Sequence, residues 1–119
     1  MDKKVITLLK TQAYIDGAWV GEPTMPVTDK ATGEVFAHVP ALGAAEAGHA
    51  IVAAHEAFKP WSKLLARERS QVLRRWYDLI IEHADELALL LTTEQGKPLA
   101  EAKGEILYGA SSVCNFIKQ

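Results

Sequence analysis

The chain has 119 residues, of which 49% are hydrophobic and 24% charged, and its formal net charge at pH 7 is -2. This composition is typical of a globular protein and excludes a disordered chain. The basic residues form no dense patch that would indicate a nucleic-acid partner, and no apolar run reaches the ~20 residues of a membrane-spanning helix.

The first third of the chain predicts strands and turns. The arms of QAYIDGAWV are rich in β-formers and flank Asp16-Gly17, a strong signal for a two-residue hairpin turn. The stretch EPTMPVTD suits an edge strand or a loop, because proline cannot donate a ladder hydrogen bond. A further strand is expected at 34–39. We therefore predict two short hairpins within 12–40, preceded by an N-terminal extension over 1–11.

From Gly43 onward the apolar residues recur with a helical period. Gly43 can act as the N-cap of a first helix with Glu46 at its third position, and Lys59-Pro60 is expected to end it, leaving PWSKLL as a connector. A second helix is expected from about residue 66 to 82. We expect Ala47, Ile51, Ala54 and Phe58 on one face of the first helix, and Val72, Leu73, Trp76, Leu79 and Ile80 on the inward side of the second.

Two more helices are expected after a junction near residue 84. The third should end at Gly96, a residue suited to the left-handed position after a helix, and Pro98 can occupy the first turn of the fourth. The fourth is still in progress at Gln119, and the apolar faces are wide for so small a body, so we expect a piece of a larger protein. The expected apolar stripes carry Leu87, Leu90 and Leu91 in the third helix, and Ala102, Ile106, Gly109 or Ala110, and Val113 in the fourth.

The stretch TTEQGKPLAEAKGEI offers two catalytic interpretations. Its Gly-Lys step is followed by proline and lacks the spacing of a phosphate-binding loop, and the sequence contains no G-x-G-x-x-G. Glu101 and Glu105 share a helix face and could form an acid–base pair if buried together. Lys97 and Lys103 are near enough in sequence to compensate them, so a solvated, salt-bridged face is favoured.

The metal-ligating and nucleophilic side chains form no recognisable set. The four histidines make no H-x-x-x-H or H-E-x-x-H pair, so metal binding is not expected. Cys114 is alone, which excludes an intramolecular disulfide, and its neighbours supply no activating base. With no secretory signal visible, a cytoplasmic location is expected. The tryptophans are interpreted as packing anchors: Trp19, Trp61 and Trp76.

Taken together, YIDGAWV, DKATGEVFAHVP, ERSQVLRRW and TTEQGKPLAEAKGEI resemble the N-terminal segment of the aldehyde dehydrogenase superfamily. The resemblance covers about residues 12–117 and is greatest to bacterial NAD(P)-dependent succinate-semialdehyde dehydrogenases. It implies an α/β family fold in which residues 12–119 supply two short β-hairpins and about four α-helices to the cofactor-binding domain.

The resemblance also implies an activity for the full-length enzyme. Such enzymes oxidise succinate semialdehyde to succinate, in 4-aminobutyrate degradation, through a cysteine thiohemiacetal, and pass hydride to NAD or NADP. The catalytic cysteine, the glutamate and the cofactor-binding segments follow the region represented here, so the chain has no catalytic or cofactor-binding residues and is expected to be inactive and to bind no cofactor. Full-length relatives are homo-oligomers.

Two alternatives remain open at this point. The chain could be a non-catalytic helical interaction module, or it could belong to an enzyme for another aldehyde, such as glutarate-semialdehyde dehydrogenase. A module that evolved to stand alone should melt cooperatively, whereas an orphaned fragment should bind a dye that reports exposed apolar surface.

The resemblance assigns a few residues to possible sites. Tyr108 matches a position that lines the substrate channel, and Gly104 matches another near its mouth. Thr28 and Glu94 match the positions from which some family members bind a monovalent cation. Leu65 stands where Thr or Ser often caps the second helix, at a cost of about 1 kcal/mol if nothing replaces the cap. The divergent ending SSVCNFIKQ suggests a truncated gene, a frameshift or a deliberately shortened chain.

Overall fold

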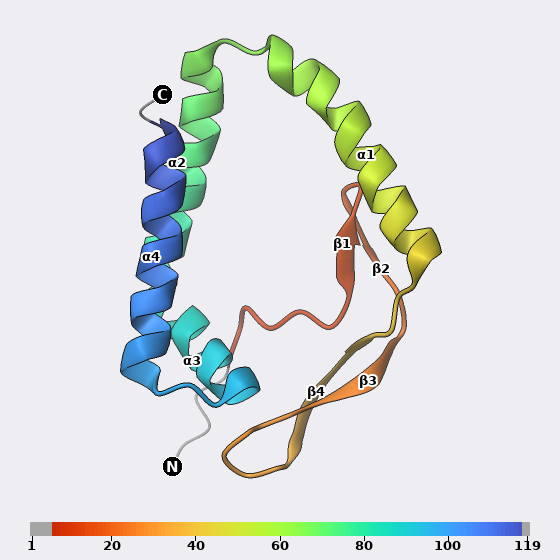
Figure 1. Ribbon diagram of the computed structural model, residues 1–119, viewed down its shortest axis with the longest axis vertical. Helices are drawn as coiled ribbons and strands as arrows, with labels where there is room; N and C mark the ends of the chain where they lie inside the picture. Colours follow the sequence, from red (N-terminus) through yellow and green to blue (C-terminus); the bar gives the residue numbers. More distant parts are fainter. Residues whose placement is uncertain (1–5, 118–119) are drawn as a thin grey trace. The chain divides into compact units, whose positions relative to one another are not determined.

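The computed structural model describes residues 6–117, and in this part of the chain two β-hairpins precede four helices (Figure 1). The predicted fold class is thereby confirmed. Positions 1–5 of the predicted N-terminal extension and positions 118–119 of the last predicted helix lie outside the described residues. The division into an extension and one domain from residue 12 stays a prediction.

The described residues form two compact units, which we treat separately. One unit contains both hairpins and the first helix, and comprises Lys10–Thr28 and Glu34–Leu64. The other contains the three remaining helices, the loop Asp29–Gly33 and the described residues before Lys10.

The first hairpin joins β1 (Ala13–Ile15) to β2 (Ala18–Val20) in antiparallel register. Its two turn residues, Asp16 and Gly17, have φ values of 51° and 77°. Two successive left-handed residues are the requirement of a type I′ turn, which Asp-Gly satisfies at low cost. The hairpin predicted from this dipeptide is therefore confirmed.

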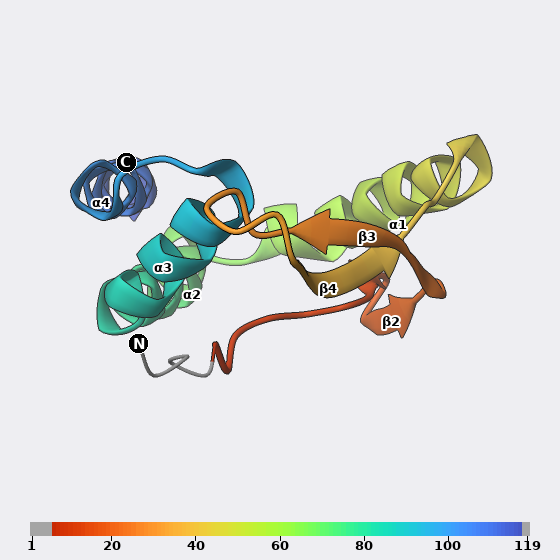
Figure 2. The same cartoon turned by 90° about the horizontal axis from the view of Figure 1, so that it is seen from below.

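The second hairpin pairs β3 (Pro23–Thr28) with β4 (Val35–Pro40), and Figure 2 shows the two strands as a ribbon. Each sheet has two strands, so every strand is an edge strand. Pro26, opposite His38, therefore disrupts no interior ladder. The strand expected at 34–39 is present and is displaced by one residue.

The first helix, α1 (Ala44–Lys63), begins as predicted, because Gly43 is its N-cap. The backbone N–H of Gly43 donates to a carboxylate oxygen of Glu46 at 3.0 Å. This hydrogen bond lowers the pKa of Glu46, whose charge also lies near the positive end of the helix dipole.

The predicted end of α1 is wrong. Pro60 lies inside the helix, which continues to Lys63. Proline lacks an N–H donor and its ring crowds the carbonyl of Glu56, yet the helix continues through Pro60 for one more turn. That turn is closed by a hydrogen bond of 3.2 Å from the Leu64 N–H to the Trp61 carbonyl. PWSKLL is therefore mainly the last turn of a helix and not a separate connector.

Alanines of α1 lie beside the first hairpin, while its larger apolar side chains are exposed. Ile51 and Phe58, which were expected on the apolar face, are both open to solvent. Small side chains let the hairpin backbone approach the helix closely. A shallow hollow of about 340 Å³ remains between them, lined by Tyr14, Ile15, Asp16, Gly17, Ala50, Ala53, Ala54 and Ala57.

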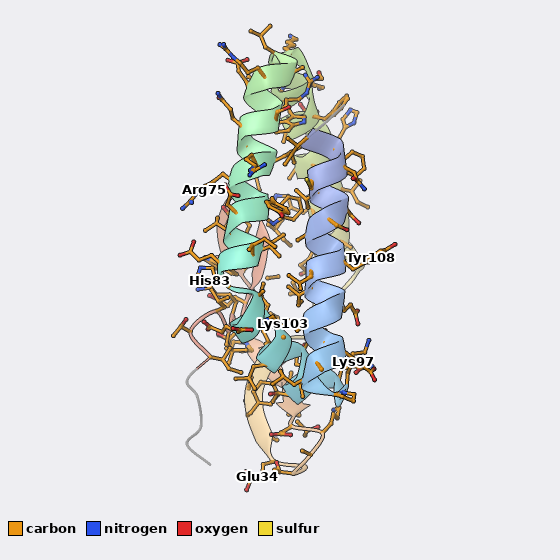
Figure 3. All side chains as sticks on the ribbon, turned by 90° about the vertical axis from the view of Figure 1, so that its left-hand side faces the viewer. Glu34, Arg75, His83, Lys97, Lys103 and Tyr108 are labelled. Carbon is orange, nitrogen blue, oxygen red and sulfur yellow. The ribbon has the colours of Figure 1, made fainter. Side chains whose placement is uncertain are left out.

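The second unit is built around α2 (Ala66–Glu82), whose bounds match the prediction, and α4 (Leu99–Ile117), which runs antiparallel beside it (Figures 1 and 3). The Ser70 hydroxyl at the start of α2 donates to the Ile117 carbonyl at the end of α4, at 3.4 Å. The connecting helix is α3 (Ala84–Gln95). His83 lies at the α2–α3 junction, where its carbonyl accepts the first hydrogen bond of α3.

The inward side predicted for α2 is partly wrong. Leu73, Leu79 and Ile80 are half-buried as expected, but Val72 and Trp76 are exposed. The apolar pattern of the sequence identifies a wide stripe, and the described part of the chain covers only one edge of it.

The interior consists of small side chains. In α3 the buried positions are Ala84 and Ala88, whereas the predicted stripe of leucines is only half-buried. In α4 the predicted face is confirmed, since Ala102, Ala110 and Val113 are buried. Methyl-sized contacts allow the helix backbones to lie close together.

The tryptophan side chains are less buried than their predicted role as packing anchors requires. Trp61 is half-buried, but Trp19 and Trp76 are largely exposed. Trp19 pairs with Tyr14 across the first hairpin, with ring centroids 5.0 Å apart, and the Lys10 ammonium lies 5.7 Å from its ring centre. This aromatic pair stabilises the hairpin without forming a core.

Among the described residues, no helix combines the length and the apolar character needed to cross a bilayer.

Candidate functional site

The junction between α3 and α4 is a helix stop followed at once by a helix start, as predicted. Gly96 has a φ of 85°, and its N–H donates to the Thr92 carbonyl at 2.8 Å. The Pro98 carbonyl then accepts the Ala102 N–H at 2.9 Å, so Pro98 immediately precedes α4. The junction fixes the direction in which α4 leaves α3.

A loop from an earlier part of the sequence supports this junction. The Lys30 N–H donates to the Thr93 carbonyl near the end of α3 at 3.1 Å. Asp29 shapes the loop, since its side chain accepts the Ala31 N–H and its carbonyl accepts the Gly33 N–H, both at 2.8 Å. Sequence reasoning missed this contact because the partners are far apart in the chain.

Ion pairs cover the exposed side of the junction. Lys97 pairs with Glu105, and that hydrogen bond raises the pKa of Lys97. Lys103 pairs with Asp85 of α3 at 2.6 Å. The predicted salt-bridged face is confirmed for Lys97 with Glu105, while Lys103 compensates a carboxylate on a different helix. The raised pKa favours the charged form of Lys97, as is usual for an ammonium group in an ion pair.

A hollow of about 520 Å³ lies between α3 and α4, and Figure 3 labels Lys103 beside it. Its lining is mostly apolar, and its two charged side chains are the Lys103–Asp85 pair. Because these charges neutralise each other, the hollow offers no unpaired anchor for a charged substrate. It is lined by Asp85, Ala88, Leu89, Leu99, Ala100 and Lys103.

The predicted channel residues lie on one open face of α4. Tyr108 is 75% exposed, and in Figure 3 its side chain points away from α2. Gly104, one turn earlier, has open space where a Cβ would stand. The Ser111 hydroxyl donates to the Tyr108 carbonyl at 2.7 Å and completes the face. An exposed phenol beside a glycine can accommodate a small molecule, and the channel role itself stays a prediction.

The other predicted site residues do not assemble into a reactive group. Thr28 ends β3, and Glu94 is exposed near the end of α3, in the other compact unit. The cation site therefore stays a prediction. Cys114 is half-buried in α4. Among residues 6–117, histidine, cysteine and carboxylate side chains nowhere form a group of three that could hold a metal ion.

Glu86 makes a contact that sequence reasoning missed. Its carboxylate accepts the Leu8 N–H at 2.6 Å and the Thr7 hydroxyl at 2.8 Å. The Leu8 N–H, followed by the Thr7 hydroxyl, lowers the pKa of Glu86. The partners lie 78 and 79 positions away, so no local pattern could have indicated these two hydrogen bonds, which we call the Glu86 clip.

Comparison with known proteins reveals extensive similarity. The model of the aldehyde dehydrogenase family matches residues 19–119. The chain is 52% identical to 3-sulfolactaldehyde dehydrogenase of Pseudomonas putida, over 100% of the chain and 25% of the relative. It is 54% identical to glutarate-semialdehyde dehydrogenase of Pseudomonas aeruginosa, over 93% of the chain and 24% of the relative.

Similarity to solved structures agrees with these matches. The crystal structure of succinate-semialdehyde dehydrogenase from Burkholderia pseudomallei matches with a TM-score of 0.84 and 54% identity, over 93% of the chain and 24% of that structure. The chain therefore spans about a quarter of the length of the relatives it matches.

Proposed function

The chain belongs to the aldehyde dehydrogenase family, and from this premise we propose that it forms the N-terminal segment of an NAD(P)-dependent enzyme that oxidises a semialdehyde to a carboxylate. The observation that carries the proposal is the identity of 52% and 54% with relatives named for 3-sulfolactaldehyde, glutarate semialdehyde and succinate semialdehyde. These three aldehydes share a negatively charged group remote from the reacting carbonyl.

Within that class we propose succinate semialdehyde as the substrate. The reaction is succinate semialdehyde + NAD(P)+ + H2O → succinate + NAD(P)H + 2 H+, as part of 4-aminobutyrate degradation in the cytoplasm, by a homo-oligomeric enzyme. Glutarate semialdehyde is the second candidate, favoured by the Pseudomonas aeruginosa relative. The comparisons give no support to a non-catalytic interaction module.

The chain supplies structure and not the reacting groups. Its sequence has no G-x-G-x-x-G to hold a dinucleotide pyrophosphate, and its only cysteine is half-buried in a helix. We therefore assign the cofactor no contact in this segment. We assign Tyr108 and Gly104 to the substrate channel, because both lie on the open face of α4.

A chimeric enzyme tests the proposal. The chain replaces the matching quarter of the Burkholderia pseudomallei enzyme, and formation of NADH or NADPH is followed with succinate semialdehyde, glutarate semialdehyde and 3-sulfolactaldehyde. We expect turnover of at least one aldehyde by the chimera and none by the 119-residue chain alone. A folded chimera that oxidises none of the three, or an active isolated chain, contradicts the proposal.

The channel assignment has a matched control in the same helix. Tyr108→Ala in the chimera should raise KM for the aldehyde, because the exposed phenol is removed from the channel face. Phe116→Ala removes another exposed aromatic side chain of α4 and should leave KM unchanged. Equal KM values for the two variants would remove Tyr108 from the channel.

A further inference from the structure

An asparagine extends the open face of α4 beyond Tyr108. Asn115 follows Tyr108 by seven positions, and because a helix repeats every 3.6 residues the two side chains lie nearly in line along α4. Gly104 precedes Tyr108 on the same side. Both Tyr108 and Asn115 are exposed, and in Figure 3 the Tyr108 side chain points away from α2. The open face of α4 therefore presents a phenol and an amide in one row.

Two small side chains lie between the phenol and the amide on this face. Ser111 and Ser112 stand one turn after Tyr108, and both are exposed. Their hydroxyls donate to the Tyr108 carbonyl, at 2.7 and 3.4 Å, so they are used in local hydrogen bonds. The Asn115 amide makes no hydrogen bond to another residue of the described range 6–117. Because side chains in a helix lean toward its N-terminus, Asn115 leans toward Tyr108.

The hydrogen-bond donors available on this face are neutral. Lys103 is the only basic residue within α4, and it pairs with Asp85 at 2.6 Å. Lys97, just before the helix, pairs with Glu105. An anionic group that reaches this face therefore meets the amide N–H donors of Asn115 and not a free cation of α4. A hydrogen bond to a charged group outweighs the opposing partial charge at the end of a helix.

We propose that Asn115 is a specificity-determining residue that binds the anionic tail of the semialdehyde. This inference rests on the proposed function, because it places the aldehyde along the face that carries Tyr108. The three aldehydes after which the relatives are named carry a carboxylate or a sulfonate. Both anions present several oxygen acceptors, and the two N–H donors of an amide can serve either. Asn115 should therefore favour an anionic tail over an uncharged one, without strong selection between carboxylate and sulfonate.

Variants of the chimera test this role with a charged and an uncharged aldehyde. Asn115→Asp keeps the shape of the side chain but replaces its donors by a negative charge, while Asn115→Leu removes the donors without adding charge. The measured quantity is kcat/KM for the anionic aldehyde that the chimera oxidises fastest, divided by kcat/KM for butanal. We expect Asn115→Asp to lower this ratio by at least about tenfold and Asn115→Leu by about three- to tenfold. Phe116→Ala, on a different side of α4, is the matched control and should leave the ratio unchanged.

The possible results separate this inference from the proposed function. An active chimera whose ratio is unchanged in Asn115→Asp overturns the role of Asn115 and leaves the proposed function intact. So does an equal loss with both aldehydes, because a residue that only supports the fold affects charged and uncharged substrates alike. A folded chimera that oxidises no anionic aldehyde refutes the proposed function. In that case, or if the chimera does not fold, asparagine and aspartate are compared at the matching position of the Burkholderia pseudomallei enzyme, and equal ratios there overturn the inference.

Discussion

Replacing Gly96 by alanine should weaken the junction that directs α4. The φ of Gly96 is 85°, and this left-handed conformation costs an L-residue about 1–2 kcal/mol. The smaller flexibility of alanine in the unfolded chain offsets about 0.5 kcal/mol of this. A Cβ here would also stand 3.1 Å from the Cβ of Lys30, so the supporting loop must shift slightly. We expect the free energy of unfolding to fall by about 1–1.5 kcal/mol.

Urea unfolding followed by far-UV circular dichroism measures this loss. Gly104→Ala is the matched control, because Gly104 lies in the interior of α4 with open space around it. That change should raise the free energy of unfolding by about 0.5–1 kcal/mol. Gly96→Asn should be less harmful than Gly96→Ala, because asparagine tolerates the left-handed region. If Gly96→Ala proved as stable as the original chain, the argument from backbone conformation would be refuted.

Two further predictions concern single contacts. Leu65 is the N-cap of α2 and has no side-chain acceptor, while its N–H donates to Glu68 at 2.7 Å. Leu65→Ser adds such an acceptor and should raise the free energy of unfolding by about 1 kcal/mol. Glu68→Ala removes the existing hydrogen bond and should lower the free energy of unfolding, and urea unfolding measures both changes. Because the folded-state pKa of Glu86 is lowered, its clip on Leu8 stabilises the fold above the ordinary glutamate pKa and is lost as pH falls through the folded value. The protection factor of the Leu8 amide, which corrects the exchange rate for its intrinsic dependence on pH, should fall over that acidic range, and it should fall at neutral pH in Glu86→Gln. A protection factor that stays the same under both changes would contradict the assignment.

The sequence predicts local features of this fold well. Asp16-Gly17 specifies its turn and Gly96 its helix end, because these conformations depend on few neighbouring residues. The end of α1 was misjudged because proline weakens a helix locally, by removing one N–H donor and crowding one carbonyl, but need not end it. Val72 and Trp76 were misplaced because periodicity defines a stripe but not which part of it is covered.

The candidate site was predicted only where its partners share a helix or a junction. The pairing of Lys97 with Glu105 follows from their short separation across the α3–α4 junction. The pairing of Lys103 with Asp85, and the clip on Glu86, depend on how separate segments pack. The family resemblance indicated Tyr108 and Gly104, which periodicity alone could only place on a common face.

The methyl-lined interior of the α2–α4 unit has a consequence for protein synthesis. Its buried positions within the described range are Ala84, Ala88, Ala102, Ala110 and Val113, and each buried CH2 or CH3 group contributes only about 0.8 kcal/mol. The first quarter of a family member leaves the ribosome before the rest of its polypeptide. It therefore emerges with a small apolar interior and with Trp76 accessible, and a partly folded chain that exposes apolar surface is prone to aggregate.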